Sequence, residues 1–111
     1  MRQILIIDDH PTVAKMIQRN LEKSGFDVVT SSDPFAAVEM VKNQDIDLVI
    51  VDHMMPGMNG LEALAHIKEQ SDDPPPVMMM TAFSSLQLAV MFVRRGGADF
   101  IERHNLYALK Q

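Results

Sequence analysis

Five short strand-like runs alternate with longer segments of helical period, and this alternation constrains the fold more than any other feature of the chain. Between the runs, apolar residues recur three or four positions apart. Strands that alternate with helices are typical of βα units in a parallel sheet. The predicted strands are Ile4–Ile7, Asp27–Thr30, Leu48–Val51, Val77–Met80 and Asp99–Glu102. We therefore expect an α/β fold with one doubly wound, five-stranded parallel sheet of order 2-1-3-4-5 and helices on both faces.

Start and stop signals predict the helices that connect these strands. The predicted helices are Pro11 to Ser24, a segment that starts at Asp33-Pro34, Leu61 to Gln70 and Ser84 to Arg95. In the second helix, Asp33 is the expected N-cap and Pro34 lies in the first turn. Its buried stripe is expected to consist of Phe35, Val38 and Val41.

Length and composition fit one domain in the cytoplasm. The 111 residues are enough for a single core, so residues 1–111 are expected to form one domain, with a short last helix within 104–111. The chain has no cysteine and no apolar run of about 18 residues that could span a membrane, and because Met1–Gln3 lead directly into the first predicted strand, no signal peptide is expected. With a net charge of −5, the adjacent pair Arg94-Arg95 does not predict direct nucleic-acid binding. The pair is either a candidate partner or dimer face or simply solvated.

Several predicted strands end in polar or charged residues of complementary chemistry. These residues are Asp8 and Asp9 after the first strand, Asp52 after the third, Thr81 after the fourth and Arg103 after the fifth. Because parallel strands present their carboxyl ends at one edge of the sheet, we expect these side chains to lie close together. Crowded carboxylates repel one another unless a hard cation neutralises them, and oxygen ligands favour Mg²⁺. The sequence therefore predicts a magnesium site at this edge.

Asp52 is the candidate for covalent chemistry at this edge. It follows a buried apolar run and precedes 53–60, a loop that turns at a Pro-Gly pair. A charge at the end of a buried strand is costly unless it is used or paired. An aspartate beside a divalent cation can attack phosphorus and form an acyl phosphate. Thr81 and Arg103 would then bind the remaining oxygens of the transferred group.

These motifs resemble the receiver domains of bacterial two-component response regulators, the family that includes the chemotaxis response regulator. The resemblance covers essentially the whole chain, through Ile4–Asp9, Asp52–Gly60, Thr81-Ala82 and Gly96–Ile101. It implies a flavodoxin-like fold, Mg²⁺ as the cofactor and Asp52 as the phosphoacceptor. By the same resemblance, Asp9 looks like a direct Mg²⁺ ligand and Asp8 like a ligand that acts mainly through water.

The resemblance also implies roles for residues further along the chain. Met54 would bind the metal through its backbone carbonyl, and Thr81 looks like the hydroxyl that moves to meet the phosphoryl group. Phe100 looks like the aromatic residue whose rotamer follows that movement. The chain departs from the family at Arg103-His104, where the family has a Lys-Pro pair. Arg keeps the positive charge, but its planar fork directs its donors differently from a lysine.

A receiver domain of this kind is a signalling switch, more a regulator than an enzyme, although it assists its own phosphorylation and dephosphorylation. The resemblance implies a sensor histidine kinase or a histidine phosphotransfer protein as the phosphoryl donor. It also implies a downstream effector protein or domain whose activity follows the conformation of the receiver. We expect all of this to take place in the cytoplasm, without direct contact to nucleic acid or membrane.

Three alternatives remain beside this expectation. A pseudo-receiver would bind partners without phosphate, because Arg103 fills or distorts the pocket. A phosphatase of the haloacid-dehalogenase type would carry a second aspartate where this chain has Met54, and a flavin protein would need a hydroxyl- and glycine-rich loop in place of 8–11. The four histidines, His10, His53, His66 and His104, fall in separate predicted elements, which argues against a histidine metal site.

Overall fold

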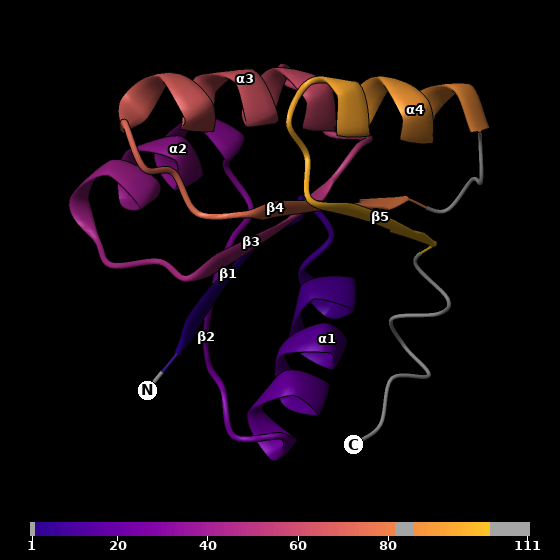
Figure 1. Ribbon diagram of the computed structural model, residues 1–111. Helices are drawn as coiled ribbons and strands as arrows, with labels where there is room; N and C mark the ends of the chain where they lie inside the picture. Colours follow the sequence, from indigo (N-terminus) through magenta and orange to yellow (C-terminus); the bar gives the residue numbers. More distant parts are fainter. Residues whose placement is uncertain (1, 82–85, 103–111) are drawn as a thin grey trace.

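The computed structural model describes residues 2–81 and 86–102, which form a five-stranded parallel sheet between two layers of helices (Figure 1). The strand order is β2-β1-β3-β4-β5, which confirms the predicted order. The strands are β1 (Gln3–Ile7), β2 (Asp27–Ser31), β3 (Leu48–Asp52), β4 (Val77–Thr81) and β5 (Asp99–Glu102). The helices are α1 (Pro11–Lys23), α2 (Pro34–Asn43), α3 (Gly60–Gln70) and α4 (Leu86–Arg94).

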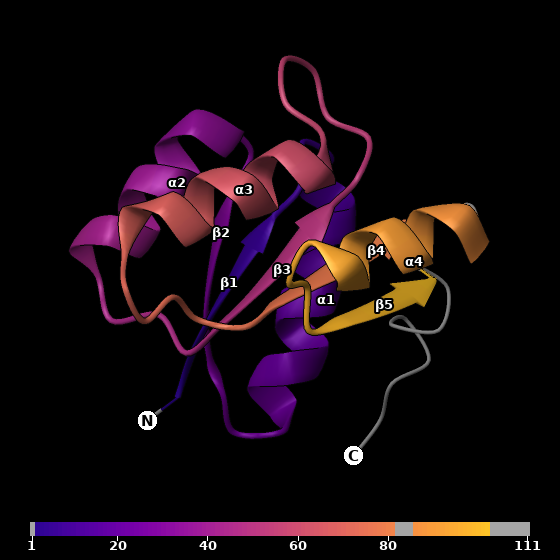
Figure 2. The same ribbon diagram turned by 45° about the horizontal axis from the view of Figure 1, so that its top comes forward.

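The helices divide unequally between the two faces of the sheet. Within the described residues, α2, α3 and α4 cover one face and α1 covers the other (Figures 1 and 2). Both faces are therefore buried, as is usual for parallel sheets, and the strands need apolar side chains on both sides. This explains why the three central strands, β1, β3 and β4, contain continuous apolar runs, whereas the edge strands β2 and β5 do not.

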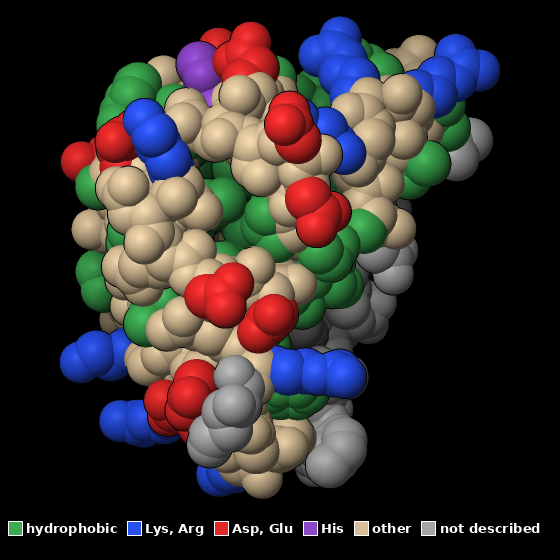
Figure 3. Space-filling view, turned by 60° about the vertical axis from the view of Figure 1, so that its left-hand side comes forward, with side chains coloured by type: hydrophobic (Ala, Val, Ile, Leu, Met, Phe, Trp, Pro, Cys, Tyr) green, Lys and Arg blue, Asp and Glu red, His purple; other side chains and the backbone are tan. Residues whose placement is uncertain are grey.

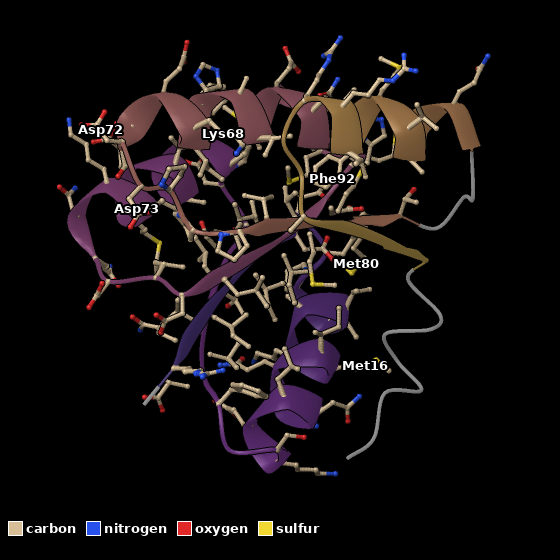
Figure 4. All side chains as sticks on the ribbon, viewed as in Figure 1. Met16, Lys68, Asp72, Asp73, Met80 and Phe92 are labelled. Carbon is tan, nitrogen blue, oxygen red and sulfur yellow. The ribbon has the colours of Figure 1, made fainter. Side chains whose placement is uncertain are left out.

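Alternating side chains of the strands supply two separate hydrophobic clusters. Ile7 and Met79 lie in the cluster beneath α2, α3 and α4, whereas Ile6 and Met80 lie in the cluster against α1. Successive residues of a strand point to opposite faces, so each apolar run serves both clusters. Figure 4 shows Phe92 of α4 above the sheet and Met80 below it. Packing on both faces holds the strands in place, and with them the polar residues at the carboxyl ends of the strands.

The register aligns the carboxyl ends of the three central strands. Ile7 of β1 pairs with Val51 of β3, and Asp52 pairs with Met80 of β4. Asp8, which follows Ile7 directly, therefore lies beside Asp52 at the edge of the sheet. The alignment places the end of β1 next to the end of β3, although a helix, a strand and another helix separate them in the sequence.

The predicted start of α2 is confirmed, but its buried stripe was partly wrong. Asp33 is the N-cap, since its carboxylate accepts a hydrogen bond of 2.9 Å from the backbone N–H of Phe35. Val38 and Val41 are buried as predicted, whereas the side chain of Phe35 is 57% exposed. Pro34 takes the buried place in the first turn and shifts the stripe by one residue. The ring of Phe35 lies instead over Gly57, 3.4 Å from where a Cβ would be.

The remaining helices agree with the prediction to within a few residues. The helix predicted for Ser84 to Arg95 is observed at Leu86–Arg94, with 82–85 outside the described residues. Phe92 is its buried anchor, whereas Val90 and Val93 are exposed. The predicted short last helix, in 104–111, also lies outside the described residues.

The surface of the described part shows mixed charge. On the face in Figure 3, acidic side chains run down the middle of the view, and Lys and Arg lie mainly toward its upper right and lower parts. A dedicated phosphate-binding surface would instead cluster Lys and Arg. Across 2–81 and 86–102, none of the helices is long and apolar enough to cross a membrane.

Candidate functional site

Asp8 and Asp52 form the buried base of the candidate site at the carboxyl edge of the sheet. Asp8 is 1% exposed and Asp52 is fully buried. The backbone N–H of Asp8 donates a hydrogen bond of 3.0 Å to the carbonyl of Ser31, so β2 also holds the end of β1 in place. The neighbouring Asp9 keeps a quarter of its side chain exposed. The three acids predicted from the strand ends are therefore brought together.

His10 joins these acids, which the sequence analysis did not anticipate. Its Nδ1 lies 3.0 Å from Oδ1 of Asp8, 3.0 Å from Oδ1 of Asp9 and 3.8 Å from Oδ2 of Asp52. One ligand atom from each of these four residues lies within 4.8 Å of the others. The sequence signal was the position of His10 directly after two acids and before Pro11, which places it at the N-cap of α1.

The backbone of His10 is held by the same carboxylate that its ring approaches. Its N–H donates a hydrogen bond of 2.9 Å to Oδ1 of Asp8. His10 has extended backbone angles, φ −105° and ψ 97°, and its side chain makes no capping hydrogen bond to the helix. The imidazole is therefore directed toward the acids, with half of its surface exposed to solvent.

The residues present fit a hard divalent cation. Oδ2 of Asp8 is buried and has no hydrogen-bond partner within the described part of the chain. A buried carboxylate oxygen without a partner is costly, because desolvation removes the water that would otherwise solvate it. A cation bound by several oxygens offsets this cost, and Mg²⁺ is typically held by one or two carboxylates together with water. The acidic cluster can therefore hold a metal ion.

The loop after β3 is tied to the sheet at both ends. The N–H of His53 donates to the carbonyl of Met80 at 3.0 Å, and the N–H of Gly60 donates to the carbonyl of His53 at 3.1 Å. Between these ties, Met55 and Met58 are buried. Met54, whose backbone carbonyl is a predicted metal ligand, has a side chain that is 63% exposed. The buried methionines anchor the loop and leave Met54 at the rim.

A capping box fixes the junction between this loop and α3. The N–H of Glu62 donates to Oδ1 of Asn59, and the N–H of Asn59 donates to Oε1 of Glu62, both at 2.9 Å. This reciprocal pair satisfies two backbone donors that the first turn of a helix leaves open. Together with Gly57 at φ +81°, it explains why the loop has one defined course from Asp52 to Gly60.

His53 is the titratable group in this loop with a perturbed pKa. Desolvation by burial lowers the pKa of His53 below 6.5, because the protonated ring loses hydration. Its Nδ1 is buried and makes no hydrogen bond to any described residue. The ring packs next to Gly60, where a Cβ would lie 3.4 Å from Nδ1 of His53.

Thr81 ends β4 at the same edge and is 2% exposed. It follows Met80, the register partner of Asp52, so the structure places this predicted hydroxyl on the neighbouring strand, one residue beyond the position of Asp52. The backbone of Phe100 lies in β5, paired with Met79, but its side chain is outside the described residues. Arg103 and His104 also lie outside them, so their predicted roles remain predictions.

Comparison with known proteins agrees with this geometry. A family model described as the response regulator receiver domain matches residues 4–107. The alkaline phosphatase synthesis transcriptional regulatory protein PhoP of Bacillus subtilis (strain 168) is 30% identical over 102 residues, 92% of this chain and 42% of that protein. The uncharacterized transcriptional regulatory protein YrkP of the same organism is 32% identical over 101 residues, 91% of this chain. The chain thus spans less than half the length of these relatives, 42% in each case.

Solved structures show the same fold. A response regulator receiver domain protein from Clostridium thermocellum is 26% identical, with a TM-score of 0.85 over 97% of this chain and 90% of that one. The response regulator protein TrrA from Thermotoga maritima, in complex with Mg²⁺ and BeF, is 25% identical, with a TM-score of 0.81 over 92% of this chain and 86% of that one. The receiver family model covers nearly all of the sequence, and the solved receiver structures have the same fold. This chain therefore belongs to the response regulator receiver domain family.

Proposed function

We propose that this chain is a phosphorylation-controlled switch in which Asp52 accepts a phosphoryl group in a Mg²⁺-dependent reaction. The observation that carries the proposal is a fully buried carboxylate at the end of β3, set among Asp8, Asp9 and His10 at ligand distance. Burial of several acids at one edge destabilises the fold unless the acids serve a ligand. The TrrA structure, which holds Mg²⁺ and BeF, supports the same chemistry in a protein of this family.

In this proposal a carboxylate oxygen of Asp52 attacks the phosphorus of a phosphohistidine in the donor protein. The new O–P bond forms while the P–N bond breaks, and the released imidazole of the donor takes up a proton. The product is an acyl phosphate on Asp52. A bound Mg²⁺ would supply neutralisation of the charge on the transferred group. Asp8, Asp9, the second oxygen of Asp52 and the backbone carbonyl of Met54 are the groups that would hold it.

The remaining rim residues are assigned to the transferred group and to the response. Thr81 donates its hydroxyl to a phosphoryl oxygen, and Arg103 provides a positive charge to another. Phe100 reports the change by altering its rotamer. The acyl phosphate stabilises the conformation in which these contacts are made, and this shifts the population of the domain toward that conformation.

The proposed partners are a sensor histidine kinase or histidine phosphotransfer protein upstream and an effector protein or domain downstream. Both curated relatives are described as transcriptional regulatory proteins and extend well beyond the matched region, which supports an effector in the same or another chain. The domain itself is proposed to be a regulator in the cytoplasm, not an enzyme acting on a separate substrate.

The test is phosphorylation of the isolated chain by acetyl phosphate in the presence of Mg²⁺, measured by intact mass. Wild type should gain the mass of one phosphoryl group, and Asp52→Asn should gain none. Asp47→Asn is the matched control, because Asp47 lies at the opposite end of β3 and is exposed. Absence of a mass gain in wild type, or an equal gain in Asp52→Asn, would contradict the proposal. A partner whose binding is the same for wild type and Asp52→Asn would instead favour the pseudo-receiver.

A further inference from the structure

We propose that His10 supplies a nitrogen ligand to the metal site, so that this receiver prefers later first-row transition ions such as Co²⁺ over Mg²⁺ more strongly than an all-oxygen site does. The inference rests on the proposed function, since it concerns the metal at the phosphoacceptor site. It adds a fourth side chain to the three acids and changes the class of ion that the site favours.

The distances around His10 are those between neighbouring ligands of one ion. Its Nδ1 lies 3.0 Å from an oxygen of Asp8 and 3.0 Å from an oxygen of Asp9, with Asp52 at 3.8 Å. In an octahedral shell with bonds of about 2.1 Å, adjacent ligand atoms are about 3.0 Å apart. The same atoms can therefore share an ion after small movements.

A second observation points to a ligand independently of these distances. Oδ2 of Asp8 is buried and has no hydrogen-bond partner among the described residues, although Oδ1 accepts from the backbone of His10. The hydrogen bonds of His10 therefore satisfy one oxygen of this carboxylate and leave the other open. A bound cation would satisfy it, whereas a histidine acting only as a hydrogen-bond partner would not.

The chain holds the His10 ring at the site before any ion arrives. The backbone N–H of His10 is bonded to Asp8, and Pro11 begins α1 immediately afterwards. The backbone direction is therefore fixed on both sides, and little conformational entropy remains to be lost in the backbone when the ring binds an ion. Half of the ring surface is open to solvent, so the partly exposed rim leaves room for water ligands.

The donor set determines which ions benefit. Mg²⁺ prefers oxygen ligands and gives up water reluctantly, whereas an imidazole nitrogen suits the later first-row transition ions, whose affinity for nitrogen ligands rises from Mn²⁺ to Co²⁺. Three carboxylates alone would serve both classes. Replacement of one water by an imidazole nitrogen favours the transition ions selectively.

The test compares Co²⁺ and Mg²⁺ binding by titration calorimetry in wild type, His10→Ala and His66→Ala. His66 is the matched control, because it is also half exposed but lies on α3 and pairs with Glu69. We expect His10→Ala to weaken Co²⁺ binding about tenfold or more and Mg²⁺ binding by less than about threefold. His66→Ala should leave both affinities unchanged.

A spectroscopic readout identifies the ligand directly. Bound Co²⁺ should shift the ring protons of His10 in the NMR spectrum far outside their normal range, and should leave those of His66 in place. An equal loss of Co²⁺ and Mg²⁺ affinity in His10→Ala, no loss of either, or an unshifted His10 ring would overturn the inference.

The two proposals fail in different measurements. If wild type binds Co²⁺ through His10 but gains no phosphoryl group with acetyl phosphate and Mg²⁺, the proposed function is wrong and the ligand assignment stands. If wild type is phosphorylated but the ratio of Co²⁺ to Mg²⁺ affinity is the same in His10→Ala, the ligand assignment is wrong and the proposed function stands.

Discussion

Two aspartates at opposite ends of β3 show how differently the two edges of the sheet are built. Asp47, directly before β3, is exposed, and its Oδ2 accepts a hydrogen bond of 2.8 Å from the backbone of Gln3. Its own N–H donates to the carbonyl of Gln3 at 2.9 Å. Asp52, the last residue of the same strand, is fully buried beside Asp8. Asp47 is solvated and links β3 to β1, whereas Asp52 belongs to the buried acidic cluster.

The difference is that the amino edge places its acid at the surface between two strands, whereas the carboxyl edge gathers buried acids that fit a ligand. At the amino edge, tight turns and an apolar groove of about 670 Å³, lined in part by Ile4, Leu21 and Phe26, dominate. At the carboxyl edge, buried polar side chains replace apolar ones. Buried polar side chains lower the free energy of unfolding relative to apolar ones, and proteins tolerate this loss where function requires it. Substitutions at the two edges should therefore have opposite consequences.

The largest expected effect concerns metal affinity. Asp9→Asn should weaken Mg²⁺ binding by about tenfold or more, because it removes a charged oxygen ligand from a site that has few. Asp47→Asn, at the other edge, should leave the affinity unchanged. Titration calorimetry with Mg²⁺ measures both. Similar affinities in the two variants would mean that the acids at the carboxyl edge do not act as a metal site.

The second prediction concerns packing at the amino edge. Gly97 precedes β5, and a Cβ there would collide with the ring of Phe92, which is fully buried. Gly97→Ala should lower the free energy of unfolding by about 1–3 kcal/mol, as overpacking in a core does. Urea unfolding measures this value.

Gly60→Ala is the comparison at the carboxyl edge, where the nearest atom to an added Cβ is the flexible Cε of Met79 at 3.0 Å. The backbone Cα of His53 follows at 3.1 Å, so the added Cβ would be crowded but would not overlap its neighbours as it does at Gly97, where an atom of the Phe92 ring would lie only 2.1 Å away. The loss of stability should therefore be smaller at Gly60. A larger loss for Gly60→Ala than for Gly97→Ala would reverse the expected order of the two edges.

The third prediction concerns the cost of the buried acids without metal. In the presence of a chelator, Asp8→Asn should raise the free energy of unfolding by about 1 kcal/mol, because it removes a buried charge with one unsatisfied oxygen. Asp47→Asn should lower it slightly, since a neutral amide is a weaker acceptor for the N–H of Gln3. Addition of Mg²⁺ should stabilise wild type and remove the advantage of Asp8→Asn. If Asp8→Asn is less stable than wild type in chelator, the carboxylate is satisfied without an ion.

The smallest expected effect is a dependence of stability on pH. Because burial lowers the pKa of His53 below 6.5 in the folded protein, the unfolded chain binds more protons between that lowered value and 6.5. The free energy of unfolding should therefore fall as the pH drops through 6.5 and level off once the pH is below the folded pKa. Urea unfolding at about pH 5.5 and about pH 7.5 measures the difference. His53→Gln should reduce the difference, whereas the exposed control His66→Gln should not.

The fold could be predicted because the local signals agree with one another. The three central strands contain continuous apolar runs, the two edge strands are shorter apolar pairs between polar residues, and proline, glycine and capping residues mark the starts and stops of the helices. The prediction that Phe35 is buried was wrong because its neighbour Pro34, in the first turn of α2, is the residue that packs into the core. A periodicity of three or four residues gives the stripe, but it does not decide which of two adjacent apolar residues faces the sheet.

The acids of the site could also be placed from the sequence, since parallel strands bring their carboxyl ends to one edge. His10 was missed because histidines were judged by their distribution over the elements. What decides its position is the turn from β1 into α1, where the backbone N–H bonds to Asp8 and directs the ring toward the cluster. The direction of the His10 ring depends on backbone angles that cannot be read from the amino-acid sequence alone.

The strand order has a consequence for how the protein is made. Because β1 and β3 are neighbours while α1, β2 and α2 lie between them in the sequence, Asp8 and Asp52 meet only after a long-range closure of the chain. Long-range strand pairing is slow compared with helix formation. A nascent or partly folded chain has Asp52 without its neighbours and therefore cannot form the acidic cluster. Under the proposed function, only molecules that have completed the central sheet can be phosphorylated at Asp52. The rate at which refolding molecules become able to accept a phosphoryl group would then report how fast β1 and β3 come together.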